Sequence, residues 1–84
     1  MNFPLYKKYT NNLSYFKVLS PDSFEEIKIT GNYYSLIKLQ AKILPERNFI
    51  EDLLKNTNGN WADISEIEYE NKLKEVKSTK KLLL

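Results

Sequence analysis

The stretch that decides the fold is residues 14–44, SYFKVLSPDSFEEIKITGNYYSLIKLQAKIL. Two groups of turn-forming residues divide it: residues 20–23, SPDS, and the pair Gly31-Asn32, which tolerates the positive φ that a tight hairpin requires. The segments between them are rich in β-branched and aromatic residues. We therefore predict three strands, over 14–19, 24–30 and 33–44, that form an antiparallel meander with one solvated face.

The third predicted strand changes phase along its length. Lys38 and Gln40 point to one side, and Leu39 points to the other. Tyr34 and Leu36 are apolar positions in the phase of Lys38, so the alternation reverses in the middle of the segment. A β-bulge would absorb a slip of one residue, and we predict such a bulge near Ile37.

The period changes to that of a helix beyond Pro45. The apolar residues after it fall on one helical stripe: Phe49, Ile50, Leu53 and Leu54. Pro45 suits the first turn of a helix, and the residues from Asn56 to Gly59 suit its end. The alternative is that 45–56 forms a strand, which the turn at Asn58-Gly59 connects to a partner strand over 61–64. The stripe favours the helix, and both structures remain open.

The C-terminal helix has a complete start signal. Residues 65–68, SEIE, match a capping box in which the Ser65 hydroxyl accepts a hydrogen bond from the Glu68 amide. Ile64 and Tyr69 have the spacing of a hydrophobic staple, and Tyr69, Leu73 and Val76 form an apolar stripe. The predicted fold class is α+β: a small antiparallel meander of about three strands packed against this capped helix and a second short helix.

The two ends of the chain have weaker patterns within a predicted single domain, 1–84. Residues 1–13 are expected to form an irregular N-terminal arm, and residues 78–84 a frayed basic and apolar tail. Leu83 follows Val76 by seven residues, so the last helix can extend and bury it. The alternative is that the tail contacts a partner, because exposed apolar residues are costly. The candidate tail contacts are Lys80, Lys81, Leu82, Leu83 and Leu84.

The composition argues against catalysis. The 84 residues include no histidine and no cysteine, which removes the commonest general base, the best nucleophile and the usual zinc ligands. Two glycines are too few for a phosphate-binding loop. We therefore expect no catalytic residue, no cofactor, no metal and no small-molecule substrate. Because so short a chain forms a thin core, association with a second copy is a means of stabilisation that remains open.

The N-terminus lacks the apolar segment of a secretory signal, and no apolar stretch is long enough to span a bilayer. We expect a cytoplasmic protein without a membrane partner. The abundant residues, Lys, Asn, Ile, Tyr and Phe, are those of AT-rich codons, which indicates a low-GC bacterial host and fits a small phage or mobile-element protein.

Two functions follow as hypotheses. The first is a non-enzymatic module that binds another protein or itself, as a regulator or inhibitor that occludes a surface. The second is nucleic-acid binding by a lysine–tyrosine face of the sheet and the basic C-terminal tail. The net charge is only +2, residues 46–70 are acidic, and no nucleic-acid-binding motif is present, so the first hypothesis is preferred. The candidate surface comprises Tyr6, Lys7, Lys8, Tyr9, Tyr15, Lys17, Tyr33 and Tyr34.

Overall fold

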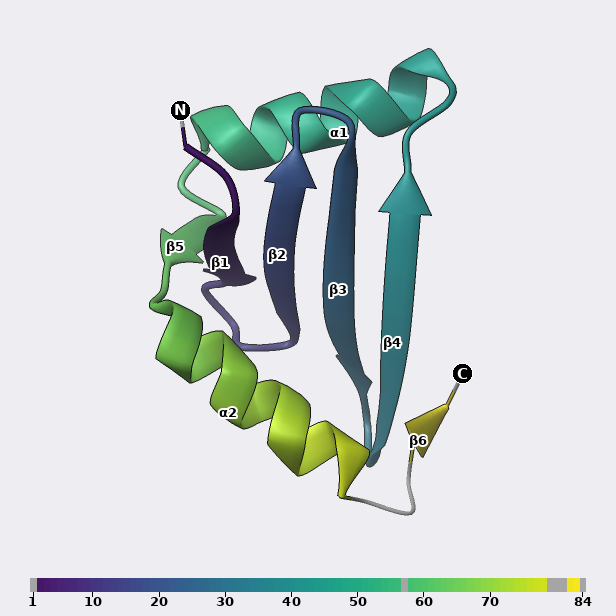
Figure 1. Ribbon diagram of the computed structural model, residues 1–84, viewed down its shortest axis with the longest axis vertical. Coiled ribbons are helices and arrows are strands. Elements are labelled where there is room, and N and C mark those ends of the chain that lie inside the picture. The colour runs from purple at the N-terminus through teal and green to yellow at the C-terminus, as the bar shows by residue number, and fades with distance from the viewer. Residues whose placement is uncertain (1, 57, 79–81, 84) are drawn as a thin grey trace.

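A computed structural model describes residues 2–56, 58–78, 82 and 83 of the chain. Along the chain its elements are β1 (Leu5–Tyr9), β2 (Ser14–Ser20), β3 (Ser23–Thr30), β4 (Tyr33–Gln40), α1 (Leu44–Lys55), β5 (Trp61–Asp63), α2 (Glu66–Lys77) and β6 (Leu82–Leu83). They form one sheet in the order β5-β1-β2-β3-β4-β6, with two helices (Figure 1). The pairing is antiparallel throughout, except that β6 runs parallel to β4.

The α+β class and the two helices are confirmed, but the number of strands is wrong. The three predicted segments form β2, β3 and β4, and the sheet also contains β1 and β5. The expected irregular arm therefore holds a strand, which pairs with β2 on one side and β5 on the other. Two lysines in the middle of β1 conceal the alternation, because Lys7 faces inward and is buried.

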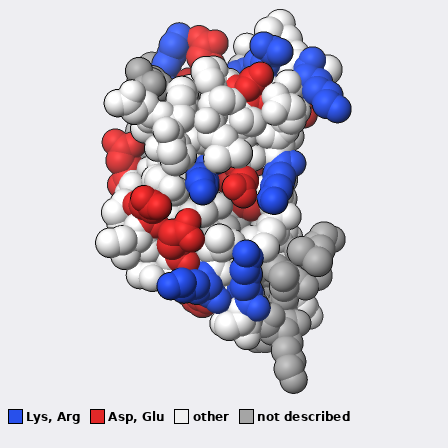
Figure 2. All heavy atoms as spheres, in the orientation of Figure 1, with Lys and Arg blue, Asp and Glu red and all other residues white. Residues whose placement is uncertain are grey.

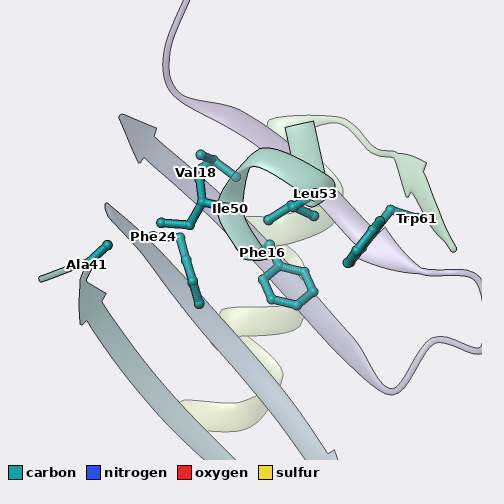
Figure 3. Close-up of a cluster of buried hydrophobic side chains, with 7 residues drawn as sticks. All are labelled: Phe16, Val18, Phe24, Ala41, Ile50, Leu53 and Trp61. Carbon is teal, nitrogen blue, oxygen red and sulfur yellow. The ribbon is translucent and has the colours of Figure 1, made fainter. Parts of the chain in front are cut away.

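The sheet has a helix on each face, so the expectation of one solvated face is wrong. Phe16 and Val18 of β2 point to the face that α1 covers, together with Phe24 of β3. Figure 1 shows α1 crossing one end of the strands. The buried cluster on this side, drawn in Figure 3, consists of Phe16, Val18, Phe24, Ala41, Ile50, Leu53 and Trp61. A strand buried on both faces carries apolar residues in both phases.

The second helix covers the opposite face at the other end of the strands (Figure 1). Tyr15 and Ile27 alternate with the residues of the first cluster and pack against Tyr69 and Val76 of α2. This arrangement explains the phase change in β4. Leu36 belongs to the α2 side and Leu39 to the α1 side, and β4 pairs with β3 without any shift of register. The bulge predicted near Ile37 is therefore wrong, and the irregularity lies in β2 instead, between Val18 and Ser20.

Residues 44–55 form a helix, which excludes the alternative of a strand. Glu46 accepts hydrogen bonds from the backbone N–H groups of Lys42 and Ile43, at 2.9 and 3.3 Å, and so satisfies donors at the helix start. Asn56 ends the helix in the left-handed conformation, with φ of 50°. Its side chain then exchanges two hydrogen bonds with the backbone of Trp61, which positions β5 beside β1.

The start of α2 agrees with the sequence. Ser65 Oγ accepts a hydrogen bond from the Glu68 amide at 3.0 Å. The helix ends at Lys77, so the alternative in which it extends to bury Leu83 is wrong. Leu82 and Leu83 instead pair with Tyr34 and Ser35 at the edge of β4. Lys80, Lys81 and Leu84 lie outside the described residues. In the described part of the chain, no helix has the length and apolar character to cross a bilayer.

Candidate functional site

The eight residues of the predicted contact surface lie on both faces of the sheet. The strand register places Tyr6, Lys8, Tyr15, Lys17 and Tyr34 on the α2 side, and Lys7, Tyr9 and Tyr33 on the α1 side. They are consequently not one continuous patch. Most of them contact other parts of the protein.

Two of the lysines are paired with carboxylates. Lys7 Nζ lies 2.9 Å from Asp63 of β5, and the Lys7 side chain is 9% exposed. Lys8 Nζ lies 3.1 Å from Glu68 of α2. Lys17 lies over the ring of Tyr6, with its Nζ 6.0 Å from the ring centre. Figure 2 shows basic and acidic side chains mixed over the visible face, with no continuous basic patch.

Most of the predicted tyrosines pack against other elements of the protein. Tyr15 is 7% exposed and lies beneath Lys72 of α2, whose Nζ is 5.3 Å from the ring centre. Tyr6 packs against Tyr69 with ring centres 5.5 Å apart, and the Tyr34 hydroxyl donates to Glu75 at 3.3 Å. On the other face Tyr9 stacks on Trp61, with ring centres 5.4 Å apart. Tyr33, at 51% exposure, is the most open of the predicted tyrosines.

A groove remains beside α2 where the helix leaves the outer strands uncovered. We call it the α2–β4 groove. Its volume is about 460 Å³, which lies within the usual range for ligand-sized pockets. A second hollow of about 300 Å³ shares Glu25 and Lys38 with it and continues toward Leu19. The α2–β4 groove is lined by Glu25, Glu26, Leu36, Ile37, Lys38, Tyr69, Leu73 and Lys77.

The groove combines an apolar wall with charged rims. Leu36 of β4 and Leu73 of α2 pack on the buried cluster around Tyr69, which gives the apolar wall. Burial raises the pKa of Tyr69, and the negative charge of Glu25 raises it further, so the phenol stays protonated well above its ordinary range. Lys38 and Lys77 are exposed at the rim. Such a site can take an apolar side chain and orient it with charged neighbours.

The outer edge of β4 runs along this groove. Thr30 and Tyr33 close the two-residue hairpin at Gly31-Asn32, so they exchange hydrogen bonds with each other. In an antiparallel strand every second residue bonds to the same neighbouring strand. Counting in twos from Tyr33, Ile37 also directs its N–H and C=O toward β3. Lys38 and Gln40 direct theirs away from β3. In the described chain, the only strand on this outer side is β6, which pairs with Tyr34 and Ser35 alone.

No family model, curated protein or solved structure matches the chain. Within residues 2–56, 58–78, 82 and 83, no three Asp or Glu side chains gather in a way that would hold a metal ion. The groove and the strand edge are the features that distinguish this surface.

Three residues of the groove are missing from the surface predicted from the sequence: Leu36, Lys38 and Lys77. The only sequence signal for them is the phase change at Leu36, which the predicted bulge explains in another way. A helix is about 10 Å wide and an eight-residue strand is about 26 Å long, so one helix cannot cover a whole face of this sheet. That comparison indicates an uncovered part of β4, although it does not say which end is uncovered.

Proposed function

We propose that this protein is a non-enzymatic protein-binding module that adds an extended segment of a partner protein to the outer edge of β4. The observation that carries the proposal is the edge itself. Beyond Ser35 the backbone groups of Lys38 and Gln40 point outward, beside a groove of about 460 Å³. Strand addition uses such an edge: backbone hydrogen bonds give affinity, and neighbouring pockets give specificity through alternate side chains.

The chain itself uses this edge in the same way. Its C-terminal strand β6 pairs with the first two residues of the outer side of β4. A partner segment that binds beyond Ser35 continues the same pairing along the strand. A small protein that holds a partner segment in this manner covers it from other molecules, which is how a regulator or inhibitor acts by occlusion.

Nucleic-acid binding is the alternative hypothesis, and the contacts of the lysines favour it less. Lys7 and Lys8, which it requires for contact with phosphate, are each within 3.1 Å of a carboxylate. A lysine whose charge is already paired contributes less to phosphate binding, because the release of counterions depends on free positive charge.

The proposal is tested with a proline at Lys38. The Lys38 N–H points away from β3, so Lys38→Pro removes an edge donor and leaves the β3–β4 ladder intact. Lys38→Thr removes the same side chain, retains the N–H and serves as the matched control. Peptides selected from a random display library on the full-length protein are then titrated against all three proteins.

The expected result is that the selected peptides bind Lys38→Thr within about fivefold of the wild type, the range of one exposed charge pair, and bind Lys38→Pro at least tenfold more weakly than Lys38→Thr. Amide resonances of Lys38 and Gln40 should shift on binding to the wild type. Equal affinity for Lys38→Pro and Lys38→Thr would show that the β4 edge is not the binding surface. A library that yields no binding peptide would also count against the proposal.

A further inference from the structure

We infer that the segment bound at the β4 edge carries an acidic side chain opposite Lys38, between apolar residues. This inference rests on the proposed function and specifies the chemistry of the partner. It follows from three observations: the charges at the rim of the groove, the consequence of pairing β4 with a second copy of itself, and the apolar side chains beside the edge.

The charged residues that line the α2–β4 groove are two lysines, one on β4 and one on α2, and two glutamates on the inner strand β3. Lys38 and Lys77 both line the groove, and neither forms an ion pair with any described residue. Glu25 lies across from Lys38 on the inner strand β3. The carboxylate of Glu26 accepts a hydrogen bond from Ser14 on the α1 side, at 2.7 Å. A carboxylate on a strand added outside β4, opposite Lys38, therefore lies beside this lysine and is separated from Glu25 by β4.

One pairing of β4 with a second copy of the chain is disfavoured by charge. Because Ser35 directs its backbone groups toward β3, its bridge to Leu83 uses the outward groups of Tyr34 and Leu36, so the outward groups that the described residues leave unpaired on β4 are those of Lys38 and Gln40. Two copies paired antiparallel about Lys38 place Lys38 directly opposite Lys38. Like charges in directly opposed positions destabilise a pair of strands, whereas opposite charges stabilise it. The lysine that disfavours this pairing favours a partner with Asp or Glu opposite it.

The neighbours of Lys38 determine the other positions of the segment. Leu36 faces the α2 side, where Tyr69 and Leu73 form the apolar wall of the groove. Ile37 and Leu39 face the α1 side. Side chains in a strand alternate between faces, so the partner presents the acid and a large apolar residue to the groove and smaller apolar residues to the α1 side.

The probe is a capped peptide with the core Leu-Val-Glu-Val-Leu between Ser and Thr residues. The core reads the same in both directions, so it presents this pattern whether it binds parallel or antiparallel to β4. Two matched peptides carry Gln or Lys in place of the central Glu. Each is titrated against the full-length wild type, Lys38→Glu, Lys38→Thr and Lys38→Pro, with the amide resonances of β4 as the readout.

We expect the Glu peptide to bind the wild type about twofold to fivefold more tightly than the Gln peptide, and this ratio to fall at high salt, because exposed charge pairs are screened. Lys38→Glu should reverse the order, so that the Lys peptide binds best. If all three peptides bind the wild type and Lys38→Glu equally, while Lys38→Pro loses binding, the acidic preference is wrong and the strand-addition function stands. If Lys38→Pro binds as the wild type does, or no peptide binds, both are overturned.

Discussion

Two proline substitutions at neighbouring positions test the orientation of the β4 backbone, on which the proposed function depends. Ile37 directs its N–H toward β3, opposite Glu26, whereas Lys38 directs its N–H away from the sheet. Ile37→Pro removes a ladder hydrogen bond and leaves the Glu26 carbonyl without its donor, at a cost of about 1–3 kcal/mol. Loss of the half-buried Ile37 side chain and crowding by the ring bring the total to about 3 kcal/mol.

Lys38→Pro is expected to change the free energy of unfolding by less than about 1 kcal/mol. It removes no hydrogen bond to β3, and the proline lowers the entropy of the unfolded chain by an amount worth about 0.4–1 kcal/mol. An 84-residue domain is stable by only about 4–13 kcal/mol, so the difference between the two variants is a large fraction of the total.

Urea unfolding followed by circular dichroism measures this difference. For an m value of about 1–2 kcal/mol/M, Ile37→Pro lowers the midpoint by about 1.5–3 M, and Lys38→Pro moves it by less than about 1 M. Ile37→Ala serves as a control, because it truncates the same side chain but keeps the N–H. The reasoning is refuted if the two prolines destabilise the protein equally, or if Lys38→Pro is the more damaging.

Three further predictions concern α2 and the strand that follows it. Ser65→Ala removes the side-chain cap of α2 and should lower the stability by about 1 kcal/mol in the same urea assay, whereas Ser65→Asp should restore it. Above pH 10 an unfolded tyrosine loses its proton while buried Tyr69 keeps it, because burial raises the pKa of Tyr69. The folded state then binds more protons than the unfolded state, so the free energy of unfolding falls as the pH rises. Tyr69→Phe should reduce this alkaline loss of stability, measured by urea unfolding at pH 8 to 11. Leu83→Pro disrupts β6 and opens more of β4, which permits antiparallel pairing centred on Ile37 with Lys38 opposite Leu36. Light scattering with size exclusion should then show a larger concentration-dependent dimer fraction than the wild type shows at the same concentration, and an unchanged fraction would contradict the predicted self-pairing.

The segments with local signals were predictable from the sequence. The hairpin at Gly31-Asn32 requires positive φ, and Gly31 has φ of 58°. The cap at Ser65 and the apolar stripe after Pro45 likewise depend on residues within a few positions of each other. In these places the chain's own neighbours determine the structure, so the sequence alone is sufficient.

The missed strands depend on contacts between distant parts of the chain. Lys7 breaks the apolar pattern of β1, and it is tolerated inside the sheet because Asp63 lies 2.9 Å away. Those two residues are far apart in sequence, so no local window contains the pair. The strand β5 has only three residues and is positioned by the Asn56 side chain, which bonds to the backbone of Trp61. A short edge strand held by a side chain has no periodicity to detect.

The candidate site was not predictable for a related reason. Whether a tyrosine on the sheet is free or packed depends on where α2 crosses it. Tyr6 and Tyr15 lie in contact with α2. Most residues of the predicted binding surface therefore form contacts within the protein. The reverse holds for Lys38. In the sequence it resembles an ordinary solvated strand residue, and it becomes a candidate site residue only because α2 ends before covering it.

The position of α2 thus determines the size of the open surface. The helix begins beside β5, crosses the lower ends of the strands and leads to β6, which pairs with the first part of the β4 edge (Figure 1). A helix about 10 Å wide leaves more than half of a strand about 26 Å long uncovered on that face. The groove occupies this remainder, and the open edge borders it. The helix α2 forms one wall of the groove and also leads to β6, which closes part of the β4 edge. A change in the packing of α2 should therefore alter the groove and the edge together. Val76, which is fully buried near the C-terminal end of α2, is the residue at which to test that coupling.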